Sequence, residues 1–462
     1  MDGKRRTSND ERRTETANDE RRTTNDRRFR IAWFSPLPPA RSGIAAYSAE
    51  LVPRLAPAHA IDCFSNETAG DFLWKAHRDP YNLVVYQLGN APCHDFMWGY
   101  MAACPGLVVL HDARLHQARA HDLLEQERFD DYRQEFWYDH PQARRDFVEY
   151  AVAGLGGPIY YCWPMLRVVM GTARCVAVHN ARVAADLREE FPEVPVEAIH
   201  LGTVPFESAD NAAGRARVRA RFGVPENAVL FAAFGKMTAE KRIEVILRAF
   251  ETMAGERGDV HLLLAGDTSE CAAIDAGRFS PALSARVHVA GYIPDQAIGE
   301  YLAASDACLC LRWPTALETS AAWVQCLAAG KPTVISDLAH LVDIPAIDPS
   351  GRSAPPASAE PIAIAVDLLD DDGSLLLALR TLAGDPLLRD ALGRAGHAYW
   401  GVNHAIEVMV RDYEQLIERA AASPVPTVAD LPPHFTDDHS ALARAITGQF
   451  GFSLDDILGS ST

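Results

Sequence analysis

The residues best suited to chemistry in this 462-residue chain lie in a polar loop that follows Leu311. An apolar strand is expected to end at Leu311, and a helix is expected from about Ala321 to Ala329, before Gly330. Thr319 and Ser320 stand where the helix cap belongs. Because first-turn amides are unpaired donors at the positive end of the helix dipole, the pattern predicts an anion site.

A carboxylate in the same loop indicates that the bound anion carries a sugar. Glu318 would repel phosphates, yet it can accept hydrogen bonds from the hydroxyls of a sugar attached to them. Arg312 and Thr315 are the other polar residues of the loop. An ordinary loop with a capping residue explains the same residues without any ligand, and this alternative stays open.

A glycine turn with three cations is the second candidate for phosphate binding. The apolar run Val229–Phe234 leads into Gly235, Lys236, Lys241 and Arg242, and an amphipathic helix follows. The lysines supply charge and the helix start supplies amides, which together suit a diphosphate. A solvated basic helix start is the alternative.

Further candidates follow short apolar runs in the N-terminal half. The run Arg30–Phe34 leads through three prolines to Gly43 and an amphipathic helix, and a glycine there lets a ligand approach the backbone. His111 follows the run Leu107–Leu110. Ligands of open α/β sheets bind outside the carboxyl ends of the strands, so both residues are site candidates. A loop glycine and a structural histidine are the alternatives.

Two parallel sheets must position these residues, because strand and helix patterns alternate in both halves of the chain. We predict an α/β protein with two Rossmann-like domains, at 29–205 and 215–396, joined by the polar linker 207–214. The first domain carries a helical insertion at about 113–170, which is either an acceptor-binding lid or a packing subdomain.

The two ends of the chain differ from the domains. Residues 1–28 repeat near-copies of RRT and NDE with almost no apolar side chains, which predicts a disordered tail. His397 to Arg419 shows the pattern of one long amphipathic helix. The extension 422–462 begins proline-rich and is expected to contain one or two small helices.

Composition excludes several classes of protein. The net charge of -18 argues against a general nucleic-acid binder, so any phosphate site must be local. Nine cysteines occur without a CxxC pair or metal-like spacing, which indicates reduced thiols in a cytoplasmic protein and no bound metal. No apolar run reaches about 18 residues, so any membrane contact would be peripheral, at the inner face of the membrane. The oligomeric state stays open.

The order of these motifs resembles the GT-B glycosyltransferases of the large family-4 group (group 1 glycosyltransferases), which are retaining enzymes that use nucleotide sugars. The resemblance covers about residues 30 to 421. The motifs that carry it are SGIAAYSAELVPRL, FGKMTAEKR, LLLAGD, HVAGYIPDQAIGEYLAASD and LRWPTALETSAAWVQCLAAGKPTVIS. It implies two domains that face each other across a cleft, with the helix at 397–421 crossing back to the first domain.

The resemblance also implies roles for the candidates on the second domain. Lys236 and Lys241 would bind the donor diphosphate, with Lys236 replacing a more usual arginine. Glu318 would hold the donor sugar, and the amides of Thr319, Ser320 and Ala321 would face the phosphates.

The remaining roles concern the first domain and the nucleoside. Gly43 would let the N-terminal loop approach the phosphates, His111 would face the transferring sugar, and Ile293 would lie beside the base. Gln325 stands where the family usually has a second glutamate that accepts a hydrogen bond from the ribose, and its interval from Glu318 is one residue shorter than usual. Glu318, Lys241 and His111 are therefore the expected catalytic residues.

The function implied by this resemblance is hexosyl transfer, with retention, from a nucleoside diphosphate sugar to a glycan, lipid-linked or small-molecule acceptor. It would need no metal or other cofactor, and its family-level setting is polysaccharide biosynthesis. The leaving phosphate would accept the acceptor proton, which fits the lack of an obvious carboxylate pair in the sequence. Two alternatives stay open: a catalytically weak module that binds nucleotide sugars, motivated by Gln325, and a sugar-nucleotide epimerase.

Overall fold

The computed structural model describes residues 28–206, 212–271, 274, 281–351, 359–428, 430–437 and 440–454. Nearly all of the predicted N-terminal tail lies outside the described residues. Most of the predicted linker 207–214 and parts of the extension 422–462 lie outside them as well.

The N-terminal half forms a parallel six-stranded sheet, in the order β2-β1-β3-β4-β5-β6. Its strands are β1 (Arg30–Phe34), β2 (Ala60–Phe64), β3 (Leu83–Leu88), β4 (Leu107–Leu110), β5 (Cys175–Val178) and β6 (Val196–Ala198). Helices α2 (Gly43–Leu55) and α18 (Ile406–Ala422) cover one face, and α3 (Asp71–Arg78), α4 (Met97–Ala103), α8 (Arg167–Thr172) and α9 (Ala181–Glu190) cover the other. Apolar side chains on both faces of β1 and β4 explain why both faces are covered.

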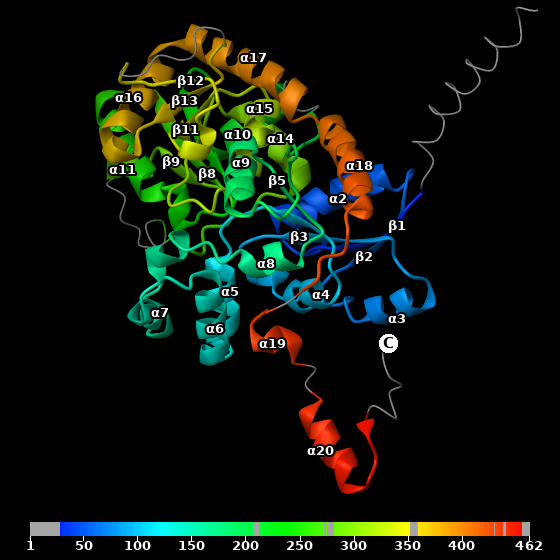
Figure 1. Ribbon diagram of the computed structural model, residues 1–462. Coiled ribbons are helices and arrows are strands. Elements are labelled where there is room, and N and C mark those ends of the chain that lie inside the picture. Colours follow the sequence, from blue (N-terminus) through cyan, green and yellow to red (C-terminus); the bar gives the residue numbers. More distant parts are fainter. Residues whose placement is uncertain are drawn as a thin grey trace, which may run out of the picture.

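The chain between β4 and β5 is helical and has a small core of its own. It contains α5 (His116–Glu125), α6 (Phe129–Asp139), α7 (Arg145–Val152), the short η2 (Gly157–Tyr161) and α8. Tyr132, Phe136 and Val148 are buried in that core. In Figure 1, α5, α6 and α7 of this insertion lie together below the second domain.

The C-terminal half forms a second parallel sheet, in the order β12-β13-β11-β10-β7-β8-β9. Its strands are β7 (Val229–Phe234), β8 (Val260–Ala265), β9 (Val287–Val289), β10 (Ala307–Cys310), β11 (Thr333–Ser336), β12 (Ala346–Ile347) and β13 (Ala363–Val366). The structure therefore confirms the predicted α/β class with two parallel-sheet domains. Strands β2, β6, β12 and β13 were missed, because they are short or lie at or near a sheet edge with polar neighbours.

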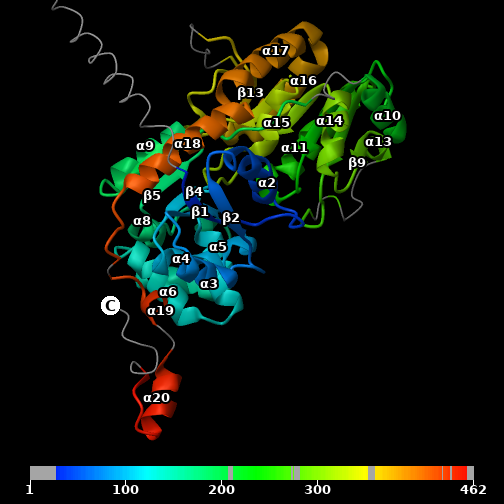
Figure 2. The same cartoon turned by 90° about the vertical axis from the view of Figure 1, so that its right-hand side faces the viewer.

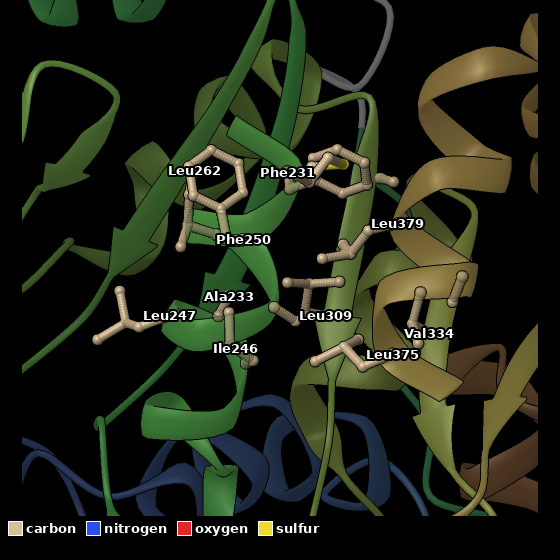
Figure 3. Packing of buried hydrophobic residues seen from close by; sticks show 14 of the residues in the cluster. Phe231, Ala233, Ile246, Leu247, Phe250, Leu262, Leu309, Val334, Leu375 and Leu379 are labelled. Carbon is tan, nitrogen blue, oxygen red and sulfur yellow. The ribbon is translucent and has the colours of Figure 1, made fainter. Parts of the chain in front are cut away.

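Helices cover both faces of the second sheet. One face packs against α11 (Ile243–Glu256) and α16 (Asp371–Gly384), where Phe250, Leu375 and Leu379 meet the strands (Figure 3). The other face packs against α10 (Ala212–Phe222), α14 (Asp295–Ala304) and α15 (Ala321–Ala328). The short elements of the second domain are η3 (Ala239–Lys241), α13 (Pro281–Ser284), η4 (Ala339–Leu341) and η5 (Leu368–Asp370). The first domain also contains a short element, η1 (Pro92–His94).

The chain returns to the first domain by two helices, so the prediction of one continuous helix from His397 to Arg419 is wrong. Helix α17 (Pro386–Asn403) ends on the second domain, and α18 begins at Ile406 and packs on α2 (Figure 2). Between them, His404 O accepts the N–H of Thr203 over 2.9 Å and His404 Nδ1 bonds Leu201 O over 2.8 Å. These bonds to the neighbouring interdomain segment replace helical bonds and break the helix.

The C-terminal extension contains two short helices. Helix α19 (Pro433–Thr436) lies against the first domain, where Leu431 is buried. Helix α20 (Ala441–Gln449) lies apart from both sheets in Figures 1 and 2. Among the described residues, no helix is long and apolar enough to cross a membrane.

Candidate functional site

The two predicted phosphate-binding segments lie together at neighbouring strand ends. Strands β7 and β10 pair in the sheet, and they end at Phe234 and Cys310. The N–H of Trp313, after β10, donates to the carbonyl of Glu240, after β7, over 2.7 Å. Both segments therefore form one surface at the carboxyl edge of the sheet, where open α/β sheets bind ligands.

Gly235 makes the turn that follows β7. Its φ is +89°, and a Cβ at this position would lie 2.7 Å from Lys241 Nζ. The amine of Lys241 donates a hydrogen bond to the carbonyl of Phe234. The turn thus needs glycine both for its left-handed backbone and for the room that the lysine occupies.

The charge of Lys241 is poorly compensated by the protein. Burial, and after it repulsion by Arg312, lower the pKa of Lys241 from 10.5 to about 7. A diphosphate next to the amine would supply the missing negative charge and raise that pKa again. An anionic ligand beside Lys241 would therefore stabilise the charged form of its amine.

The other two cations of the predicted cluster point away from Lys241. Lys236 is half exposed, and its amine pairs with Glu270. Arg242 pairs with Asp371 at the start of α16. The structure thus brings Lys241 alone of the three to the surface between β7 and β10, and Lys236 would have to leave Glu270 to reach a diphosphate there.

The loop after β10 holds Glu318 by both of its carboxylate oxygens. Arg312 Nε lies 2.6 Å from Glu318 Oε1, and Thr315 Oγ1 donates to Glu318 Oε2 over 2.9 Å. Leu317 adopts a φ of +64°, a strained conformation for a leucine, and this directs the following glutamate into the loop. The carboxylate is fixed in place before any ligand binds.

Helix α15 begins immediately after this loop. Ser320 Oγ accepts the N–H of Trp323 over 3.3 Å and caps the helix, as predicted for this position. The hydroxyl of Thr319 donates to the carbonyl of His179 in the first domain over 2.9 Å. The hydroxyls are therefore engaged, and the first-turn amides are the groups left to donate to an anion.

Bonds between the domains hold this loop against the first domain. The N–H of Ala113 donates to the carbonyl of Ala316 over 2.8 Å, and Asn180 Nδ2 donates to the carbonyl of His340 over 2.9 Å. From the insertion, Tyr161 donates to Glu240 Oε1 over 2.7 Å. The loop with Glu318 is therefore in direct contact with the first domain.

The candidates on the first domain occupy different positions. Gly43 is the first residue of α2, and a Cβ there would meet nothing within 4 Å. His111 turns inward: its Nε2 bonds Gln87 Oε1 over 2.8 Å, and its ring packs on Tyr47. Burial holds the pKa of His111 well below its usual value, so the imidazole is neutral. Gln87 in turn bonds Tyr413 of α18, which ties His111 to the returning helix.

Ile293 lies away from the phosphate-binding surface, in the loop between β9 and α14. Its side chain is buried, and it lines a cleft of about 290 Å³ between α10 and α14. Tyr292 is half exposed beside it, and Arg41 from the loop before α2 stacks on the Tyr292 ring at 4.5 Å. The loop of the first domain that carries Gly43 therefore reaches the loop that carries Ile293.

Comparison with known proteins agrees with this arrangement. The family model described as group 1 glycosyl transferases matches residues 228–372, which contain β7, Lys241, Glu318 and α15. The matched segment, residues 228–372, is therefore similar to the group 1 glycosyl transferases. One curated relative of the chain is the 2-deoxystreptamine glucosyltransferase of Streptomyces kanamyceticus, 28% identical over 203 residues. That match covers 44% of this chain and 49% of the relative, so the chain spans about half the length of the relative.

Solved structures of other proteins have the same fold as this chain. Sucrose-phosphate synthase from Thermosynechococcus elongatus has a TM-score of 0.59 at 17% identity, covering 86% of this chain and 100% of that one. HepE of Anabaena, in complex with UDP and glucose, has a TM-score of 0.58 at 12% identity, covering 84% and 99%. At these identities the likeness concerns the fold alone.

Two charged residues near Glu318 were given no role of their own from the sequence, although both stand in or beside predicted site segments. Arg312 was seen only as a polar loop residue, although a cation near an expected sugar-binding glutamate could have suggested the pair. Asp112, directly after His111, faces Glu318 from the first domain, and Glu318 contributes to a raised Asp112 pKa. The approach of Asp112 to Glu318 could not be predicted from the sequence, because the two residues belong to different domains.

Gln325 departs from the family pattern and lies one helical turn after the start of α15. Its side chain is half buried, and within the described ranges its amide has no hydrogen-bond partner. The amide is thus available to a ligand, as a ribose contact would require. It lacks the charge of the usual glutamate, which weakens such a hydrogen bond.

Proposed function

We propose that this protein transfers a glycosyl unit from a nucleoside diphosphate sugar to an acceptor, with retention at the anomeric carbon and without a metal. The observation that carries the proposal is the position of Lys241 beside the Arg312–Glu318 pair, at the start of α15. A cation and helix amides suit the diphosphate, and a fixed carboxylate suits the sugar attached to it. A nucleoside diphosphate sugar contains both groups.

Lys241, Glu318 and Arg312 would each have a different role in cleavage of the glycosidic bond. Negative charge accumulates on the leaving diphosphate as the glycosidic bond breaks, and Lys241 together with the α15 amides would stabilise it. Glu318 would orient the sugar through its hydroxyls. Arg312 forms an ion pair with Glu318 and would add positive charge near the phosphates. The acceptor proton would pass to the leaving diphosphate oxygen, so no carboxylate nucleophile is needed.

The comparisons suggest which substrates to test first. HepE was solved with UDP and glucose, which favours UDP sugars as the first donors. The relative named as a 2-deoxystreptamine glucosyltransferase favours a small-molecule acceptor over a glycan or a lipid-linked sugar. Donor nucleotide, donor sugar and acceptor are set by side chains of the cleft rather than by the fold.

A panel of nucleotide sugars, with EDTA present, tests this function. We expect slow release of a nucleoside diphosphate and the free sugar with at least one donor, and the α configuration retained when an acceptor is found. Nuclear magnetic resonance of the anomeric proton reads the configuration. Inversion of that configuration would contradict the proposed mechanism.

The departure at Gln325 favours one second candidate, a module that binds nucleotide sugars with little or no turnover. The same panel separates the two functions. Binding of a nucleotide sugar without release of diphosphate under any condition would support the binding module. Absence of binding by every nucleotide tested would contradict both candidates.

A further inference from the structure

A carboxylate on the first domain faces the site with unused hydrogen-bonding capacity. Asp112 lies just beyond β4, and its Oδ2 accepts the N–H of Asn90 over 2.7 Å. Within the described part of the chain, no hydrogen bond reaches Oδ1 and no lysine or arginine pairs with Asp112. Its side chain is half buried, and Oδ1 is not among the fully buried polar atoms, so this oxygen is accessible to a ligand.

Contacts between the domains place Asp112 opposite Glu318. Ala113, the next residue, bonds Ala316 over 2.8 Å, and Thr319 bonds His179 over 2.9 Å. Hydrogen bonds to the first domain therefore flank Glu318 in the sequence, at Ala316 before it and at Thr319 after it. A ligand group held by Glu318 lies close to Asp112.

The charges around Asp112 keep a fraction of it protonated near neutral pH. Burial, and after it repulsion by Glu318, raise the pKa of Asp112, while the Asn90 N–H and Arg312 lower it, and together these effects bring it to about 7. His94 is the other titratable neighbour: a Cβ on Gly89 would lie 3.1 Å from His94 Nε2 and 3.2 Å from Asp112 Oδ2. Burial lowers the pKa of His94 to about 4, so this imidazole stays neutral while Asp112 titrates.

The two carboxylates differ in what they can still bind. Both oxygens of Glu318 already have partners, and Arg312 balances its charge. Among the described residues, Asp112 has one oxygen without a hydrogen-bond partner and forms no ion pair with a lysine or arginine. Because the proposed donor sugar occupies the side of Glu318, the free oxygen of Asp112 is open to the second substrate.

We propose that Asp112 forms the acceptor subsite, where its Oδ1 accepts a hydrogen bond from the attacking hydroxyl of an alcohol acceptor. This inference rests on the proposed glycosyl transfer. The acceptor oxygen bonds to the anomeric carbon as the bond from that carbon to the diphosphate oxygen breaks. The single hydroxyl proton, which Asp112 holds by a hydrogen bond before the attack, leaves that hydrogen bond and passes to the released diphosphate oxygen. Asp112 orients the hydroxyl and keeps no proton.

Water can take the place of the alcohol, so the test needs no knowledge of the natural acceptor. Hydrolysis of the donor found in the panel is measured at saturating donor between pH 5.5 and 8.5, for the wild type and Asp112→Asn. We expect kcat of the wild type to rise with pH as Asp112 ionises, at or above pH 7. Asp112→Asn is expected to lower kcat about a hundredfold and to remove this rise, with unchanged donor affinity.

Asp95→Asn is a matched control. Burial also raises the pKa of Asp95 to about 7, but its charged neighbours are Asp122, Arg119 and Glu125, away from Glu318. We expect this variant to keep the wild-type rate and pH profile. A similar loss in Asp95→Asn would show that any buried carboxylate of this domain matters, and would overturn the assignment.

The remaining outcomes separate this inference from the proposed function. Wild-type kcat and pH profile in Asp112→Asn, with turnover lost in Lys241→Ala, would overturn the acceptor subsite and leave the glycosyl transfer standing. Loss of donor affinity in Asp112→Asn would assign Asp112 to the donor site instead. No hydrolysis of any donor by the wild type would overturn the proposed function and this inference together.

Discussion

Lys241 carries a titratable charge at the point where we propose that the diphosphate binds. A nucleoside diphosphate sugar does not itself titrate near neutral pH, so the lysine dominates the pH dependence of its binding. Burial sets the lysine pKa at about 7 in the free protein, far below 10.5. A bound diphosphate favours the charged form and raises that pKa, so binding takes up a proton above pH 7.

The affinity for a nucleoside diphosphate sugar is therefore expected to fall as pH rises. Below pH 7 the free protein already holds the charge and affinity changes little. Above pH 7 affinity is expected to fall by up to about tenfold per pH unit. Titration calorimetry from pH 6 to 9 measures this dependence.

Lys241→Arg is the matched variant, because arginine keeps its charge throughout this range. We expect its affinity to be independent of pH, whatever its absolute value. A wild-type affinity that stays constant from pH 6 to 9 would remove Lys241 from the diphosphate site.

At the scale of the element, the turn after β7 depends on a glycine that makes room for the lysine. Gly235→Ala would put a Cβ 2.7 Å from Lys241 Nζ and would strain a backbone with φ of +89°. We expect about 1 kcal/mol or more of lost stability and a large loss of nucleotide affinity. Urea denaturation and calorimetry measure the two effects.

Gly223→Ala separates strain from displacement of the lysine. Gly223 has a φ of +65°, but a Cβ there would meet nothing within 4 Å. This variant is expected to lose similar stability and to keep full nucleotide affinity. Equal losses of nucleotide affinity in both alanine variants would mean that displacement of Lys241 by the Cβ at position 235 is not the cause of the loss.

Local patterns were enough to predict the elements of the donor site. Glycine, cations and a capping residue after apolar runs predicted Gly235, Lys241 and Ser320 as site candidates, while the pairing of β7 with β10 came from the structure. The partners of these residues could not be predicted in the same way. The Arg312–Glu318 pair depends on the backbone of Leu317, and the break at His404 depends on bonds to a distant segment.

In the whole molecule, the segment that contains Leu431 and His434 packs against the first domain. Leu431 is buried against the core of that domain, and His434 Nε2 bonds Glu135 Oε1 over 2.7 Å. Arg119, which is also buried, pairs with Glu135 from the other side. By contrast, Leu442 and Phe450 of the segment around α20 are exposed.

Two truncations test this description. A chain that ends after Ser423 loses the buried Leu431 and the His434–Glu135 bond, so we expect it to be about 2–3 kcal/mol less stable to urea. A chain that ends after Asp437 keeps both and is expected to match the wild type. The description would be wrong if both truncated chains were equally stable.

We propose that Lys241 binds the phosphates of the donor and that Glu318 binds its sugar. Affinities for a nucleotide with and without the sugar test these two roles separately. Calorimetry compares UDP with the UDP sugar selected by the panel, for the wild type, Lys241→Ala and Glu318→Gln. Lys241→Ala is expected to weaken both ligands. Glu318→Gln is expected to bind UDP at least as well as the wild type, because Arg312 is released, and to bind the UDP sugar about tenfold or more weakly. Unchanged affinity of Glu318→Gln for the sugar nucleotide, or an equal loss for UDP, would contradict the central claim.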